Sequence, residues 1–130
     1  MNMLRDKVNI TVFVSGGGTN LQSIIDSINS GYLNKAEIVR VISSNNNAYA
    51  LQRAKDSGIE GICINKEQWP DEGKQHEAII HAVEEANTDL IVLAGYMKIL
   101  QPKLINLYRD RIINIHPSLI PKYCGKAFYG

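Results

Sequence analysis

The sequence predicts an α/β domain in which helices cover both faces of an open, mostly parallel β-sheet. Two observations lead to this prediction. Short apolar segments typical of buried strands alternate along the chain with segments whose apolar residues recur at helical spacing. Such alternation favours parallel strands joined by crossover helices. The first strand-type segment is largely apolar on both faces, as central parallel strands are.

The first half of the chain contains two strand–helix pairs. Residues 7–15 predict a strand that is largely apolar on both faces, as central parallel strands are. The helix after it has apolar residues at i, i+3, i+4 and i+7, namely Leu21, Ile24, Ile25 and Ile28. We expect Gly31 to end this helix. The second pair is a strand at 37–44 and a helix at 48–57, which Gly58 closes.

The second half continues the same alternation. Its predicted elements are a strand at 61–65, a loop at 67–74, a helix at 74–87, a strand at 90–94, a helix at 102–108 and a strand at 111–115. The proline at the start of the last helix suits a first helical turn.

The composition is that of one folded domain, which we expect to span residues 1–130. Hydrophobic residues make up 45% of the 130 residues and charged residues 21%, which are ordinary values. A net charge of +1 argues against a nucleic-acid-binding surface over the whole domain. No apolar run approaches the ~18 residues of a membrane span, and the start of the chain lacks the apolar core of a secretory signal. The two cysteines have neither zinc nor disulfide spacing, so we expect a cytoplasmic protein without a bound metal.

Residues 15–20, Ser-Gly-Gly-Gly-Thr-Asn, form a glycine-rich turn between the first strand and the first helix. Glycines allow a ligand to approach the backbone closely, and the helix start offers unpaired N–H groups at the positive end of its dipole. Together these features favour an anion, most often phosphate. The turn lacks the last small residue of the dinucleotide fingerprint and the Gly-Lys-Ser/Thr of a P-loop. The alternative is a plain turn in which Thr19 or Asn20 caps the helix.

Asn114 and His116 form a second candidate site at the end of the last predicted strand. Side chains alternate along a strand, so the two share one face, and Pro117 stops the strand directly after them. A histidine can transfer a proton near neutral pH, and an asparagine amide can donate to a developing oxyanion. One proton-transfer group and one oxyanion donor are the minimum set of groups that acyl transfer needs. Neither Ser118 nor Cys124 has an evident base, which suggests that the nucleophile belongs to a substrate. The alternative is a purely structural strand end.

Residues 95–100, Gly-Tyr-Met-Lys-Ile-Leu, follow the fourth predicted strand and have two interpretations. They are either core plus turn or the wall of a pocket for a flat ring. His76 and His81 are five positions apart and therefore do not share a helical face, so we expect structural roles for both.

Four motifs occur in order along the chain. They are Ser-Gly-Gly-Gly-Thr-Asn-Leu-Gln (15–22), Ser-Ser-Asn (43–45), Leu-Ala-Gly-Tyr-Met-Lys-Ile-Leu (93–100) and Asn-Ile-His-Pro-Ser-Leu-Ile-Pro-Lys (114–122). With these motifs the chain resembles the phosphoribosylglycinamide formyltransferases, the folate-dependent glycinamide ribonucleotide transformylases of purine synthesis. The resemblance covers nearly the whole chain. Methionyl-tRNA formyltransferases share the Asn-x-His-Pro-Ser element, but their first loop differs.

The resemblance implies a Rossmann-like formyltransferase fold and two small-molecule substrates, with no metal, nucleic acid or membrane partner. In the implied reaction, the amine of glycinamide ribonucleotide attacks the formyl group of 10-formyltetrahydrofolate. The implied roles are phosphate binding for Gly18, Thr19 and Asn20; folate binding for Met97, Lys98, Ile99, Leu100 and Asn114; and catalysis for His116, as the proton-transfer residue, and Asn114, as the oxyanion stabiliser.

Two departures from the family pattern bear on activity. Family members carry a catalytic aspartate, further strands and a final helix after the segment that matches this chain, so we expect residues 1–130 to be an N-terminal portion of the domain. Members often place an arginine near the folate tail, where this chain has Lys74. The alternatives are a catalytically impaired phosphate-binding module and another folate-dependent formyltransferase. A dinucleotide-binding domain of the dehydrogenase type is a weaker hypothesis, because Ser43-Ser44-Asn45 stands where an acidic residue would bind the ribose.

Overall fold

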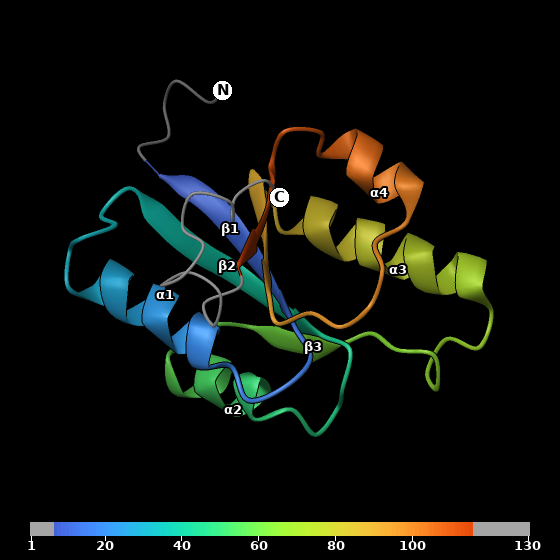
Figure 1. Cartoon of the computed structure of the whole chain (residues 1–130), viewed down its shortest axis with the longest axis horizontal. Coiled ribbons are helices and arrows are strands. Elements are labelled where there is room, and N and C mark those ends of the chain that lie inside the picture. Colours follow the sequence, from blue (N-terminus) through green and yellow to red (C-terminus); the bar gives the residue numbers. More distant parts are fainter. Residues whose placement is uncertain (1–6, 116–130) are drawn as a thin grey trace, which may run out of the picture.

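The computed structural model of the chain describes residues 7–115, which form a five-stranded parallel sheet between two pairs of helices (Figure 1). The elements are β1 (Val8–Val14), α1 (Thr19–Asn29), β2 (Ala36–Ser43), α2 (Tyr49–Asp56), β3 (Gly61–Cys63), α3 (Glu72–Glu85), β4 (Leu90–Ala94), α4 (Pro102–Leu107) and β5 (Ile112–Ile115). The predicted α/β class and the predicted order of strands and helices are therefore confirmed.

The strands are arranged in the order β3-β2-β1-β4-β5, which places β1 at the centre. Because β1 has a strand on each side and helices on both faces, Val12, Phe13 and Val14 are fully buried. Val12 and Val14 face α1 and α2, whereas Phe13 faces α3 and α4. This double burial explains why the sequence of β1 is an almost continuous apolar run.

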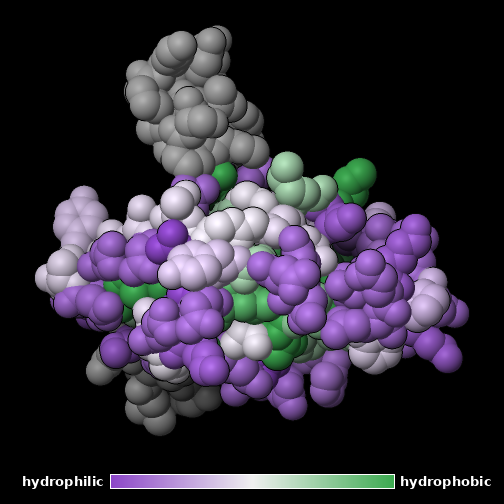
Figure 2. Space-filling model, turned by 90° about the horizontal axis from the view of Figure 1, so that it is seen from below, coloured by the Kyte–Doolittle hydropathy of each residue, from purple (hydrophilic) through white to green (hydrophobic). Residues whose placement is uncertain are grey.

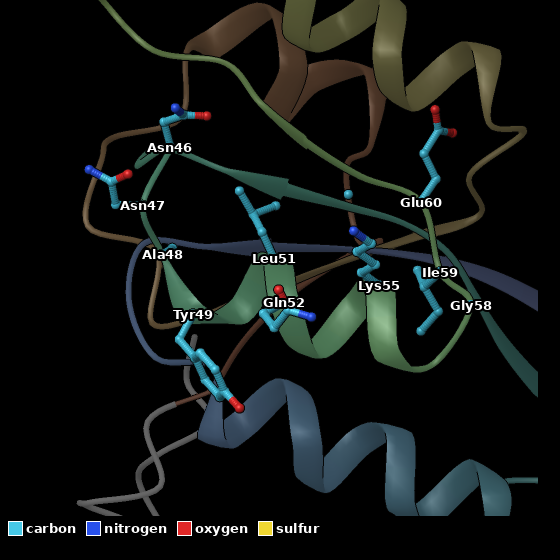
Figure 3. Close-up of a pocket in the computed structure, with 11 residues that line it drawn as sticks. Asn46, Asn47, Ala48, Tyr49, Leu51, Gln52, Lys55, Gly58, Ile59 and Glu60 are labelled. Carbon is cyan, nitrogen blue, oxygen red and sulfur yellow. The ribbon is translucent and has the colours of Figure 1, made fainter.

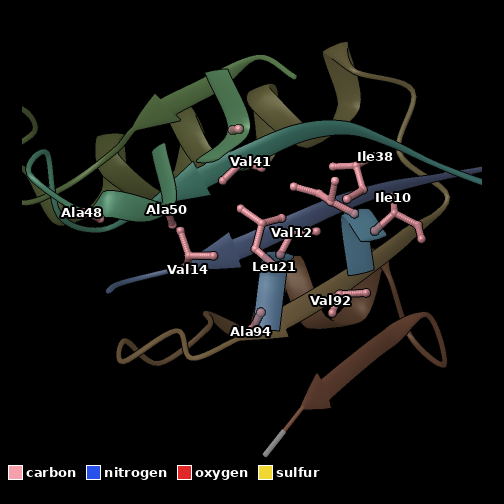
Figure 4. Packing of buried hydrophobic residues seen from close by; sticks show 12 residues of the cluster. Ile10, Val12, Val14, Leu21, Ile38, Val41, Ala48, Ala50, Val92 and Ala94 are labelled. Carbon is pink, nitrogen blue, oxygen red and sulfur yellow. The ribbon is translucent and has the colours of Figure 1, made fainter. Parts of the chain in front are cut away.

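Two hydrophobic cores lie on the two faces of the sheet. The first joins β1, β2 and β4 to α1 and α2, and Figure 4 shows its side chains gathered between these elements. The second joins the opposite face to α3 and α4. The apolar stripe predicted for the first helix is confirmed, since Leu21 and Ile25 are buried while Ile24 and Ile28 pack beside them.

Glycine ends the first two helices as predicted. Gly31 and Gly58 each lie one residue beyond the C-cap and have φ values of 88° and 74°. Left-handed backbone at this position is common at helix ends, because the freed N–H groups then bond to the last helical carbonyls. The N–H of Gly31 accordingly donates to Ile28, and that of Gly58 donates to Lys55.

Most predicted boundaries differ from the structure by one or two residues, and hydrogen bonds explain two of these differences. The predicted loop at 67–74 is wrong in its last part, because α3 already begins at Glu72. Asp71 causes the earlier start, since its carboxylate accepts a hydrogen bond from the Lys74 N–H and caps the helix. β3 ends at Cys63 instead of residue 65, because the side chain and carbonyl of Asn65 accept bonds from the N–H groups of Gln68 and Trp69 in a turn.

A buried pair of hydroxyl groups joins β1 to the turn before β4. The Oγ1 atoms of Thr11 and Thr88 lie 2.6 Å apart, and both side chains are buried. Each hydroxyl is the hydrogen-bond partner of the other, so neither is left unsatisfied in the core.

Thr11→Val should lower the free energy of unfolding by about 1–3 kcal/mol, because it leaves the Thr88 hydroxyl buried without its partner. The double variant Thr11→Val/Thr88→Val should lose less than the single variant, since no buried polar group is left unpaired. Urea unfolding of both variants measures the difference. A double variant that is less stable than the single one would show that the unpaired hydroxyl is not the source of the loss.

Candidate functional site

The carboxyl ends of the strands meet at one edge of the sheet, toward the bottom of Figure 1. The chain moves outward from β1 to β3 and then crosses to β4 and β5 on the other side, so the strand order reverses between β1 and β4. Open α/β sheets bind ligands at such a reversal. The glycine-rich turn follows β1, and residues 95–101 follow β4. Figure 2 looks onto this edge and shows a mainly hydrophilic surface with small hydrophobic areas between the polar side chains.

Ser15 holds three strand ends together at this reversal. Its Oγ lies 2.6 Å from the Oγ of Ser44, which follows β2, and accepts a hydrogen bond of 2.9 Å from the N–H of Met97, which follows β4. One hydroxyl therefore ties the start of the glycine-rich turn to the loop after β4. Sequence reasoning assigned no role to Ser15 or Ser44. The sequence contains a signal that could have identified them, because a serine follows each of two strands that pair with each other, β1 and β2.

The glycine-rich turn has a backbone conformation that favours glycine. Gly18 is the N-cap residue of α1, with φ 83° and ψ 27°. A Cβ atom at Gly18 would lie 2.7 Å from the Cβ of Ala50 and 2.8 Å from its Cα, because α2 packs against the turn. The alternative in which Thr19 or Asn20 caps the helix is wrong. Both residues are already helical, because the left-handed Gly18 starts α1 directly before them.

Unused hydrogen-bond donors gather at the start of α1. The first helical bond runs from Gln22 N–H to the Gly18 carbonyl over 2.8 Å. The N–H groups of Gly18, Thr19 and Asn20 donate to no other residue within 7–115. The first turn of α1 also contains no acidic residue. The three residues predicted to bind phosphate thus form a compact set of donors at a positive helix end, which suits an anion. Phosphate binding itself stays a prediction.

A hollow of about 990 Å³ lies between the loop after β4 and the start of α3. Ser44 and Asn45 contribute to its wall from the end of β2. Met97 and Ile99 also line it, and these large apolar side chains are 79% and 87% exposed. Adjacent apolar side chains at the mouth of a hollow favour a ligand with an apolar part.

Three of the four loop residues predicted for the folate pocket line this hollow. Met97, Lys98 and Ile99 belong to its wall, whereas Leu100 is half-buried and packs on the core between the sheet and α3 and α4. The interpretation of residues 95–100 as core plus turn is confirmed for Tyr96 and Leu100, which pack on the core. The residues between them line the hollow, but a role for them in binding a flat ring stays a prediction.

Sequence reasoning did not place four further charged or titratable residues at this hollow, namely Lys66, Glu67, Glu72 and His76. Lys66 follows β3, and His76 lies on α3; both line the hollow. Lys74 stands where the formyltransferases that the chain resembles often have an arginine, but it lines a separate hollow with Trp69 and Cys63. The sequence alone does not show that Lys66 lines this hollow, because its position depends on β3 and β4 lying in one sheet.

Asn114 lies at the carboxyl end of β5, opposite Leu93 of β4. Its side chain is exposed, as predicted for a polar residue that opens toward the ligand edge. It shares a face with Ile112, which packs against the core of α3 and α4, so Asn114 lies on the side of the sheet that carries the 990 Å³ hollow. His116 lies outside the described residues, and its pairing with Asn114 stays a prediction.

Tyr96 anchors the loop after β4 to the centre of the sheet. Its ring packs edge-on against Phe13, with 5.1 Å between the centroids and 84° between the planes. Burial of the phenol raises the pKa of Tyr96 to about 12, because the charged form loses contact with water.

A hollow of about 890 Å³ lies elsewhere, beside α2 and β3 (Figure 3). Its lining contains none of the four sequence motifs, so the reversal between β1 and β4 remains the candidate site. Within the described range, no three His, Cys, Asp or Glu side chains gather as metal ligands would. No helix of that range is long and apolar enough to span a membrane.

Comparison with known proteins adds independent findings. Residues 8–130 match the model of the family described as formyl transferase. The phosphoribosylglycinamide formyltransferase of Haemophilus influenzae is 45% identical over 120 residues, which are 92% of this chain and 56% of that protein. The phosphoribosylglycinamide formyltransferase of Escherichia coli is 37% identical over 118 residues, which are 91% of this chain and 55% of that protein.

The solved structures include close relatives of the same fold. A phosphoribosylglycinamide formyltransferase from Coxiella burnetii superposes with a TM-score of 0.80 at 40% identity and covers 90% of this chain. The match spans 55% of that structure. The chain therefore spans slightly more than half the length of these relatives.

Gly18→Ala should lower the free energy of unfolding by about 2–5 kcal/mol. Left-handed backbone costs alanine ~1–2 kcal/mol, and the contact with Ala50 adds ~1–3 kcal/mol of overpacking. Gly31→Ala is the matched control, because Gly31 has φ 88° but the added Cβ would have no atom of the described residues within 4 Å. Urea unfolding should give the smaller loss for Gly31→Ala. Equal losses would mean that the contact with Ala50 contributes nothing.

The raised pKa of Tyr96 predicts a loss of stability in strong alkali. The unfolded chain releases this proton near the ordinary pKa of 10.0, before the folded chain does near 12. The stabilisation is therefore complete below pH 10.0 and declines as the pH rises toward 12. Tyr96→Phe should remove this part of the decline. Urea midpoints of both proteins across that pH interval provide the measurement, and an identical decline in the variant would contradict the assignment.

Proposed function

The chain belongs to the formyl transferase family, and from this premise we propose that it transfers a formyl group from 10-formyltetrahydrofolate to the amine of glycinamide ribonucleotide. The family implies a folate-derived formyl donor. The names of the most similar relatives support the ribonucleotide as the acceptor. One structural observation carries the proposal: a cluster of unused N–H donors and a hollow with an apolar wall lie on the two sides of one strand-order reversal.

The two substrates would occupy the two loops at this reversal. The N–H groups of Gly18, Thr19 and Asn20 supply donors for the ribonucleotide phosphate at the positive end of α1. The wall of Met97, Lys98 and Ile99 offers apolar surface and a cation to the folate. Leu100 would hold this wall in place through its packing on the core. Since Ser15 is bonded to Met97 and directly precedes the glycine-rich turn, the two binding loops keep a fixed relation.

The reaction needs a proton acceptor and a group that stabilises negative charge. The substrate amine attacks the formyl carbon, and the carbonyl oxygen becomes an oxyanion. The exposed Asn114 amide at the end of β5 is available to donate to that oxygen. We assign the proton transfer to His116, which would take the proton from the attacking amine and supply one to the folate nitrogen as its bond to the formyl carbon breaks.

An assay with both substrates tests the proposed function in the intact protein. Formation of tetrahydrofolate that depends on glycinamide ribonucleotide is the expected result. Phosphate binding without any tetrahydrofolate would instead support a phosphate-binding module that lacks turnover. Protection of the protein against thermal unfolding by NADH, with no effect of either formyl-transfer substrate, would overturn the proposal in favour of a dinucleotide-binding domain.

Asn114→Ala should lower kcat by about 10²–10³-fold while KM for glycinamide ribonucleotide changes little, because the amide acts on charge that develops only in the transition state. His116→Ala should likewise lower kcat far more than substrate affinity. Steady-state kinetics with each substrate varied in turn provide the measurement. Asn46→Ala is the matched control, since Asn46 is an exposed amide in the hollow beside α2. A kcat close to that of the parent in both variants would remove the assigned roles.

A further inference from the structure

Arg53 of α2 contacts the glycine-rich turn from outside. Its Nε donates to the Gly17 carbonyl over 2.7 Å, and its Nη1 donates to the Gln22 Oε1 over 3.1 Å. The guanidinium carbon also lies 4.9 Å from the ring centroid of Tyr49, one turn earlier on α2. Figure 3 shows Tyr49 extending from the start of α2 toward α1. Partners from the turn, from α1 and from α2 thus fix the guanidinium in one place.

We propose that Arg53 is a positioning residue for the phosphate-binding turn, which orients the Gly17–Gly18 peptide and strengthens the Gly18 N–H as a donor to phosphate. This inference rests on the proposed function, in which Gly18, Thr19 and Asn20 bind the phosphate of the substrate.

The geometry of the peptide bond connects Arg53 to the ligand. The Gly17 carbonyl and the Gly18 N–H belong to one planar peptide group, so a bond that fixes the direction of the oxygen also fixes the direction of the hydrogen. A charged donor on the oxygen draws electron density toward it and makes the N–H on the other side a stronger donor. Arg53 would therefore act on the phosphate through the backbone, without touching it.

The turn needs such a restraint from outside. Within residues 7–115, no atom lies within 4 Å of a Cβ position at Gly16 or Gly17, so neighbouring side chains of that range do not confine their backbone. The N–H of Ala50 donates to the Gly16 carbonyl over 3.2 Å, and Arg53 restrains the next carbonyl. Two consecutive carbonyls of the turn are thus held by α2, which leaves the N–H groups that follow them free to face a ligand.

The positive charge of Arg53 also attracts an anion toward the turn, although the guanidinium does not touch it. The ion pairs within 7–115 do not involve Arg53, so no carboxylate of that range neutralises it. A lysine would supply the charge but not the planar group that bonds Gly17 and Gln22 at once.

Titration of the intact protein with inorganic phosphate by calorimetry tests the proposal. Arg53→Ala should weaken phosphate binding by about tenfold or more, since a charge-assisted hydrogen bond to the turn is lost. Arg53→Lys should weaken it by about threefold, because the charge remains while the planar group is lost. Lys55→Ala is the matched control: it removes the same charge from the same helix, but Lys55 lines the hollow beside α2, and binding should stay within about twofold of the parent.

Equal weakening in Arg53→Ala and Lys55→Ala would overturn the proposal, because general charge would then explain the effect. Full affinity in Arg53→Lys would also overturn it, and so would a parent protein that does not bind phosphate. Urea unfolding identifies loss of fold in Arg53→Ala; the test then rests on Arg53→Lys, which keeps the aliphatic stem.

Kinetics separate positioning from a merely structural role. KM for glycinamide ribonucleotide should rise in Arg53→Ala, while kcat and KM for 10-formyltetrahydrofolate stay near the parent values. A similar loss in all three parameters would contradict the positioning role. If the parent transfers no formyl group, the proposed function fails, but the phosphate titration still decides the role of Arg53.

Discussion

The burial of β1 on all sides constrains the rest of the molecule. A strand with partners on both edges and helices on both faces can carry only apolar side chains or polar ones that satisfy each other, as Thr11 does with Thr88. Polar side chains that could contact a ligand are therefore excluded from the central strand, and the first one lies on the residue directly after it. That residue is Ser15, whose hydroxyl connects the ends of β1, β2 and β4. The candidate site exists where it does because the central strand ends there.

The elements of the fold could be predicted because local periodicity and burial agree. The stripe from Leu21 to Ile28 fits a helix with one buried face, and the apolar run of β1 fits a strand with two. The errors arose where a single contact decided the outcome. A carboxylate at Asp71 starts α3 before Gly73, although glycine and proline in that stretch indicated a loop. The close approach of Ala50 makes Gly18 the cap of α1 in place of a side chain that could cap it.

The candidate site was predictable in its loops but not in its supporting residues. The glycine-rich turn and residues 97–99 follow strands directly, so their place at the carboxyl edge follows from the alternation of elements alone. Lys66, His76 and Arg53 join them only through tertiary structure, because each belongs to a segment whose position depends on which strands pair. No local pattern marks such residues. Lys74 illustrates the reverse case, since its place in the sequence suggested a ligand role and the fold directs it to another hollow.

The two halves of the candidate site differ in how firmly they are held before a ligand arrives. The glycine-rich turn is restrained by two consecutive carbonyl bonds from α2 and by the closed space at Gly18, so its N–H groups need little rearrangement to meet an anion. The opposite loop is fixed at its ends, by Ser15 at Met97 and by the core at Tyr96 and Leu100, while its apolar side chains stay exposed. Covering those side chains would supply hydrophobic free energy to the second ligand. In the proposed function, a charged group would thus be recognised by prior orientation of the N–H groups, and a flat ring by burial against the apolar side chains.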